Sequence, residues 1–103
     1  MSDVLEQLYR TLESRKLNAP AGSYTAKLYA AGEDEIVKKI GEEAIEVIVA
    51  AKGQGDARVV SEMADLVYHS MVLLAARGIA WHSVEEELAR RFKPAANAGP
   101  AAG

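Results

Sequence analysis

Five acidic residues fall into two short groups whose spacing could build a metal site. The first group, E-E-x-x-E, contains Glu42, Glu43 and Glu46, and the second, E-x-x-D, contains Glu62 and Asp65. Residues three or four positions apart share one side of an α-helix. If the two groups face each other on neighbouring helices, four carboxylates converge and repel one another unless a cation binds between them. Since the ligands are all oxygens, we expect Mg²⁺, with Mn²⁺ as the alternative.

Two other interpretations compete with a magnesium site. Acidic and basic residues at helical spacing usually form a solvated face, and Lys39 could simply pair with Glu35 or Glu43 on such a face. The second acidic group favours the metal site, because it lies in an otherwise apolar helical stretch that we expect to be largely buried. A di-iron site is disfavoured, since such sites use Glu-x-x-His pairs and neither His69 nor His82 follows a glutamate by three positions.

Apolar residues recur at helical spacing along most of the chain and predict an all-α fold. The central helices, residues 34–52 and 57–77, should form an antiparallel pair, because a short glycine-containing turn joins them. Asp56 is the predicted N-cap of the second central helix, and the S-x-x-E spacing of Ser83 and Glu86 predicts a capping box. The remaining helices are predicted at residues 3–16, 24–31 and 84–92. We therefore expect a bundle of about five helices, completed by homodimerisation.

Composition narrows the class of protein further. The 103 residues carry a net charge of −3 and scattered basic residues, which disfavours nucleic-acid binding. The absence of cysteine excludes disulfides and thiolate metal sites. The first residues lack the pattern of a signal peptide and no uninterrupted apolar run spans a membrane, so we expect a cytoplasmic protein without membrane partners. We assign residues 1–93 to one domain and predict that the Ala/Gly/Pro-rich residues 94–103 are disordered.

The pairing of E-E-x-x-E with E-x-x-D resembles the all-α nucleoside triphosphate pyrophosphatase superfamily, the MazG-like group. Within that group the chain is most similar to the phosphoribosyl-ATP pyrophosphatase family of histidine biosynthesis. The similar segments cover nearly the whole chain except the tail. They are SYTAKLYAAG (23–32), IVKKIGEEAIEVIVAAK (36–52), EMADLVYHSMVLLAARG (62–78) and VEEELARR (84–91).

This resemblance implies a homodimer that hydrolyses phosphoribosyl-ATP to phosphoribosyl-AMP and pyrophosphate. It implies metal ligands at Glu43, Glu46, Glu62 and Asp65, with Glu42 as a further ligand or a general base. Either Glu42 or Glu46 would activate the attacking water.

Charge on the substrate must also be balanced by cations from the protein. Lys39 is the first candidate for phosphate contact because it lies one helical turn before Glu43. Lys52 and Arg91 are further candidates, although each could equally be an ordinary surface residue.

Three uncharged or weakly basic residues complete the predicted substrate-binding set. Tyr24 and Thr25 are candidates for contact with ribose or phosphate if their short helix covers the pocket. His69 falls on the same helix side as Asp65, but a lone histidine in an apolar helix is more often a core residue.

Two alternative functions remain open on the sequence. A house-cleaning pyrophosphatase acting on other nucleoside triphosphates would use the same metal chemistry. A non-catalytic helical dimerisation module would carry the acids only as surface charge.

Overall fold

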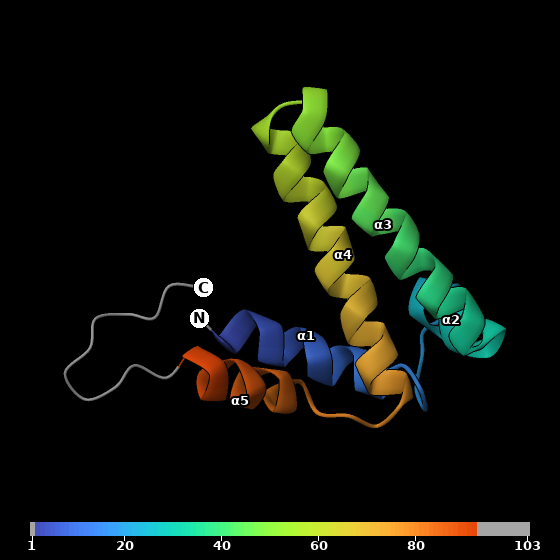
Figure 1. Cartoon of the computed structure of the whole chain (residues 1–103). Helices are drawn as coiled ribbons and strands as arrows, with labels where there is room; N and C mark the ends of the chain where they lie inside the picture. The colour runs from blue at the N-terminus through green and yellow to red at the C-terminus, as the bar shows by residue number, and fades with distance from the viewer. Residues whose placement is uncertain (1, 93–103) are drawn as a thin grey trace.

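Residues 2–92 are described by the computed structural model and form five α-helices (Figure 1). Between Ser2 and Phe92 the chain contains no strand, so the predicted all-α class is confirmed. The tail predicted to be disordered, residues 94–103, lies outside the described range. The helices are α1 Ser2–Ser14, α2 Tyr24–Ala31, α3 Glu33–Gly53, α4 Asp56–Ala76 and α5 Trp81–Phe92.

The central feature is an antiparallel hairpin of the two longest helices, α3 and α4 (Figure 1). The turn between them contains Gly55, whose φ of 89° is a backbone conformation that glycine adopts without steric cost. At the other end of the hairpin, Arg77 donates two hydrogen bonds of 2.8 Å to the carboxylate of Glu33. The predicted antiparallel pair is therefore present, with its start and end tied together by a bidentate ion pair.

The hydrophobic core lies at the end of the hairpin away from the turn that contains Gly55. The hydroxyl groups of two tyrosines hydrogen-bond to the main chain of neighbouring segments around this core. Tyr29 of α2 donates to the carbonyl of Leu12 at 2.7 Å, and Tyr9 of α1 donates to the carbonyl of Ile79 at 2.5 Å. The apolar residues buried in this core come from four helices and are Tyr9, Leu12, Leu28, Ile36, Met71, Val72 and Ala75.

Half of the central hairpin exposes apolar side chains, contrary to the expectation that α4 is largely buried. Val60 of α4 is 69% exposed and Ile45 of α3 is 61% exposed. The buried apolar residues of α4 all lie in its second half, because the core is assembled there. A single copy of the chain therefore leaves an apolar surface uncovered on the arm of the hairpin.

Two predicted helix starts were wrong. The last helix begins at Trp81, which places Ser83 inside its first turn, where the Ser83 amide donates to the Ala80 carbonyl at 3.0 Å. The indole of Trp81 packs against the core and donates to Glu85 at 3.2 Å, so tertiary packing starts this helix earlier than the capping-box spacing indicates. Asp56 is the first residue of α4, and Gly55 takes the cap position.

By length and composition α4 could cross a membrane, with 21 residues and a mean hydropathy of 1.4 in its most apolar window. Core helices of soluble proteins pass the same test. The middle of α4 carries Glu62, Asp65 and His69, and its second half supplies the core. Length and composition are therefore weak evidence for a membrane span here.

Candidate metal-binding active site

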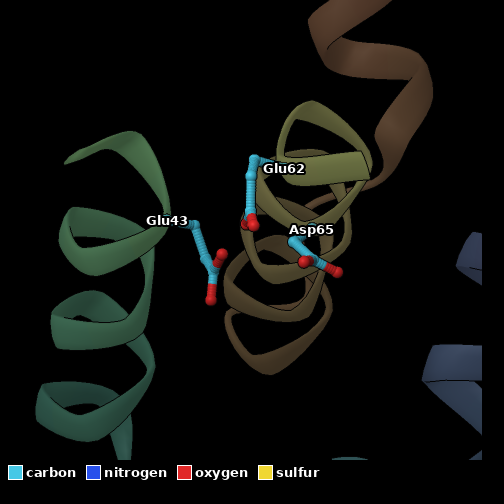
Figure 2. A group of neighbouring side chains, drawn as sticks. All are labelled: Glu43, Glu62 and Asp65. Atoms are coloured by element: carbon cyan, nitrogen blue, oxygen red, sulfur yellow. The ribbon is translucent and has the colours of Figure 1, made fainter. Parts of the chain in front are cut away.

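Three of the predicted ligands converge between the two central helices. Glu43 reaches from α3 toward Glu62 and Asp65 of α4, and one carboxylate oxygen from each lies within 4.8 Å of the others (Figure 2). Glu62 is only 6% exposed, Glu43 is half-buried and Asp65 is exposed. Glu62 therefore lies at the buried end of the group, and Asp65 lies at the solvent-exposed end, from which a ligand can enter.

The hairpin geometry explains why these residues meet. In an antiparallel pair, residues equally far from the turn lie at the same level, because both helices rise about 1.5 Å per residue. Glu43 precedes Gln54 by 11 positions and Asp65 follows Gly55 by 10. Glu62 lies one turn from Asp65 on the same side of α4 and completes the group.

The charge of Glu43 is disfavoured by its surroundings. Partial burial raises the pKa of Glu43, and the neighbouring carboxylates of Asp65 and Glu62 raise it further, while His69 and Lys39 act in the opposite direction. The net rise means that the surroundings of Glu43 disfavour its negative charge. A hard cation among these oxygens would remove that cost, and three carboxylates are the donor set such a cation prefers.

Arg58 already supplies part of the missing positive charge. Its guanidinium lies 2.6 Å from the carboxylate of Glu62, one helical turn away on α4. Arg58 was not among the residues predicted for the site. The i, i+4 spacing with Glu62 was the available signal, and burial of Glu62 makes the pair matter.

The other two glutamates of the first group lie beside the cluster. Glu46 is exposed on α3, and the group of three that the described residues bring together does not include it. Glu42 is also exposed, and Lys39 lies 3.3 Å from its carboxylate. This hydrogen bond is the main cause of the raised pKa of Lys39. The roles of Glu42 and Glu46 remain predictions.

The short helix α2 brings Tyr24 and Thr25 to α4. Ser23 caps this helix by accepting a hydrogen bond of 3.1 Å from the Ala26 amide. The Tyr24 hydroxyl lies 3.0 Å from Nε2 of the buried His69, and the buried Thr25 hydroxyl is hydrogen-bonded to the hydroxyl of Tyr68. Tyr68 was not among the residues predicted for the site, because nothing local in the sequence indicated its partner on α2.

The two remaining candidate cations lie elsewhere in the single chain. Lys52 is exposed in the last turn of α3, roughly 13 Å along the helix axis from Glu43. Arg91 belongs to α5, which lies beside α1 (Figure 1), and its guanidinium is 2.9 Å from Glu87. One copy of the chain does not bring Lys52 or Arg91 to the carboxylates.

Comparison with known proteins connects this arrangement to one family. Residues 5–92 match the family described as Phosphoribosyl-ATP pyrophosphohydrolase. The chain is 55% identical over 89 residues to a phosphoribosyl-ATP pyrophosphatase of Pelotomaculum thermopropionicum, covering 86% of this chain and 91% of the relative. It is 48% identical over 95 residues to a phosphoribosyl-ATP pyrophosphatase of Methanocella arvoryzae, covering 90% and 100%.

A third relative joins two activities in one polypeptide. The chain is 44% identical over 91 residues to the histidine biosynthesis bifunctional protein HisIE of Caldanaerobacter subterraneus, covering 88% of this chain and 44% of that protein. The match to the family model spans all five helices and every residue of the carboxylate group. The chain belongs to the phosphoribosyl-ATP pyrophosphohydrolase family.

Proposed function

We propose that the chain hydrolyses phosphoribosyl-ATP to phosphoribosyl-AMP and pyrophosphate, a step of histidine biosynthesis, in the cytoplasm. The observation that carries this proposal is the convergence of Glu43, Glu62 and Asp65 within the segment matched by the family. The names of the similar proteins support the choice of substrate. The hydrolysis requires an attacking water, a base to take its proton and neutralisation of the phosphate charge.

The cofactor of this proposal is Mg²⁺, with Mn²⁺ as the alternative. Glu43, Glu62 and Asp65 would hold the ion, and the closeness and mutual repulsion of their carboxylates support this assignment. When bound, a divalent ion at such a site neutralises phosphate charge and lowers the pKa of a water molecule.

For the base we favour Glu46 over Glu42. Both are exposed on α3 next to Glu43, but the ammonium of Lys39 already holds the carboxylate of Glu42. The base takes a proton as the water oxygen bonds to phosphorus, and the bridging bond between the α and β phosphates breaks to release pyrophosphate. Lys39 would contact the phosphates while remaining beside Glu42.

The proposed assembly is a homodimer formed through the exposed arm of the hairpin. Ile45 and Val60 are among the most exposed apolar side chains on α3 and α4, and such patches on soluble proteins mark interaction surfaces. An apolar groove of about 470 Å³ lies between α1 and α4 and would receive side chains of a second copy. The groove is lined by Val4, Leu5, Leu8, Val59, Val60, Met63, Ala64 and Val67.

A second copy also offers a source for the missing phosphate-binding cations. Lys52 and Arg91 lie away from the carboxylates of their own chain but are exposed. We propose that the partner's copy of one or both residues completes the site. Two variants, Glu43→Ala and Arg91→Ala, should each be inactive alone. When the two are mixed, part of the activity should return through mixed dimers.

The test is pyrophosphate release from phosphoribosyl-ATP, compared with a panel of deoxynucleoside triphosphates, with and without Mg²⁺. We expect turnover of phosphoribosyl-ATP only, dependent on Mg²⁺ and lost in Glu43→Ala. Glu13→Ala, which removes an exposed acid of α1, is the matched control and should retain activity.

Two outcomes would overturn the proposal in different ways. Turnover of the deoxynucleotides instead would keep the metal chemistry and assign a house-cleaning pyrophosphatase. No turnover and no Mg²⁺-dependent rise in melting temperature would indicate a non-catalytic helical module.

A further inference from the structure

A chain of two hydrogen bonds links α2 to the backbone of α4 beside the carboxylate group. Nδ1 of His69 lies 2.8 Å from the main-chain carbonyl oxygen of Asp65, and Nε2 lies 3.0 Å from the Tyr24 hydroxyl. A carbonyl oxygen can only accept, so Nδ1 must carry a hydrogen. A neutral imidazole has one N–H, which makes Nε2 the acceptor and the Tyr24 hydroxyl the donor.

This bonding pattern decides what Tyr24 can still bind. A phenol has a single hydrogen, and His69 occupies it, whereas the lone pairs of the oxygen remain available. A phosphate oxygen needs a donor, which Tyr24 no longer offers. A hydroxyl group of a ribose is itself a donor and fits the free lone pairs.

The location of Tyr24 is suited to substrate contact. The residue is 47% exposed although its hydroxyl reaches the buried His69 of α4. Burial raises the pKa of the Tyr24 phenol, while the ammonium of Lys39 lowers it and the carboxylate of Glu43 raises it.

We propose that His69 is a positioning residue that turns the Tyr24 hydroxyl into a hydrogen-bond acceptor for a ribose hydroxyl of the substrate. The inference rests on the proposed function for the identity of the nucleotide substrate. It divides the predicted substrate-binding set by chemistry, with Lys39 facing phosphate and Tyr24 facing sugar. His69 itself is 5% exposed and acts through Tyr24.

A neighbouring contact provides the matched control. Thr25 and Tyr68, each adjacent in sequence to one partner of the Tyr24–His69 pair, are joined by their hydroxyl groups. The Tyr68 ring stands edge-on to the His69 imidazole, with centroids 5.0 Å apart. Tyr68→Phe removes a bond that attaches α2 to α4 but keeps the ring beside His69 and leaves the donor of Tyr24 engaged.

The first experiment reads the tautomer directly and needs neither metal nor substrate. Long-range ¹H–¹⁵N spectra of the labelled full chain, recorded at about pH 8 where an ordinary imidazole is neutral, distinguish the two neutral forms. The chain has 2 histidines, and His82→Gln assigns the signals. We expect His69 in the Nδ1–H form. An Nε2–H form or an imidazolium would overturn the proposal.

The second experiment measures substrate discrimination with a nucleotide analogue lacking a ribose hydroxyl. We expect Tyr24→Phe to raise KM for phosphoribosyl-ATP by about threefold to tenfold with little change in kcat, and to abolish discrimination against the analogue. His69→Leu should have the same effect, and it should cause no further loss when combined with Tyr24→Phe. His69→Gln should restore part of the discrimination, because glutamine supplies an acceptor.

Other results would contradict the role of Tyr24. Equal loss toward both nucleotides, or additive losses in the double variant, would show that Tyr24 or His69 acts in another way. The melting temperatures of the variants distinguish such a different role from a general loss of stability. Tyr68→Phe is the reference for that loss. Failure of the wild type to hydrolyse phosphoribosyl-ATP would overturn the proposed function while leaving the tautomer measurement intact.

Discussion

The guanidinium of Arg58 lies 2.6 Å from the carboxylate of Glu62, the most buried acid of the candidate metal site. The pair lies on one face of α4, one helical turn apart. It places a fixed positive charge where the proposed Mg²⁺ would also be attracted. Arg58 therefore stabilises the negative charge of the carboxylate group and would compete with a bound cation.

Replacing Arg58 by alanine should lower the stability of the metal-free protein and tighten Mg²⁺ binding. Because half-exposed ion pairs contribute up to about 1 kcal/mol, we expect the Mg²⁺ concentration at half-maximal thermal shift to fall by up to roughly fivefold. Thermal unfolding against Mg²⁺ concentration measures both effects. Arg10→Ala, which removes the exposed pair with Glu6, is the control and should leave the Mg²⁺ midpoint unchanged.

Neutralising Glu43 should stabilise the metal-free chain in a pH-dependent way. The folded pKa of Glu43 is raised above its ordinary value of 4.5, so between these two values the folded state binds more protons than the unfolded state. Stability contributed by this group is thus lost as pH rises through that window, and the penalty is complete above the folded pKa. Glu43→Gln removes the penalty.

The free energy of unfolding in urea with EDTA, measured for wild type and Glu43→Gln, checks this prediction. The advantage of the variant should grow as pH rises from about 4.5 and then level off. With Mg²⁺ added, the order should reverse, since only the wild type retains the ligand. A variant less stable than wild type in EDTA at neutral pH would contradict the repulsion among these carboxylates.

Charges placed on the exposed arm should break the proposed dimer. Ile45→Glu and Val60→Glu put a carboxylate where we place apolar packing, and burial of an unpaired charge is costly. Light scattering coupled to size exclusion should give the dimer mass for the wild type and the monomer mass for each variant. Leu17 is 88% exposed in the loop after α1, and Leu17→Glu should remain dimeric.

The Tyr29 hydroxyl should make stability sensitive to alkaline pH. Burial is the main cause that raises the pKa of Tyr29 from 10.0 to about 12, and the hydroxyl donates to the Leu12 carbonyl at 2.7 Å. The resulting stability is fully present below pH 10.0 and is lost as pH rises through about 12, because the folded state keeps the proton longer.

Tyr29→Phe therefore has a defined signature. It should cost about 1 kcal/mol at neutral pH, the typical value of a lost hydrogen bond, and it should reduce the fall in stability above pH 10.0. Urea unfolding at neutral and alkaline pH tests both parts. A variant with the same alkaline fall as wild type would assign that fall to other tyrosines.

The helices and their pairing could be read from the sequence because both are local properties. Apolar periodicity indicated all five helices, and the short turn around Gly55 left α3 and α4 only an antiparallel arrangement. The start of α5 could not be read in this way. The capping-box pattern at Ser83 is a local signal, and packing of Trp81 against the core overrides it.

The candidate site was predictable to the extent that it follows from one hairpin. Spacing put Glu62 and Asp65 on one side of α4, and the distance from the turn brought Glu43 level with them. Glu46 was expected as a ligand from the family resemblance, and its role stays a prediction because the group of three among the described residues does not include it. The partners of buried polar side chains, Tyr24 with His69 and Glu62 with Arg58, depend on side-chain placement that spacing does not specify.

The sequence by itself determined the all-α class, the central hairpin and the acidic sides of its two helices, since helical periodicity acts over a few residues. Only the tertiary structure decided which acids converge, how α2 docks on α4 and which apolar face stays uncovered. The physical reason is that burial, desolvation and hydrogen-bond direction arise from contacts between segments far apart in the chain. The same contacts leave Ile45 and Val60 exposed on the surface that we propose for the partner.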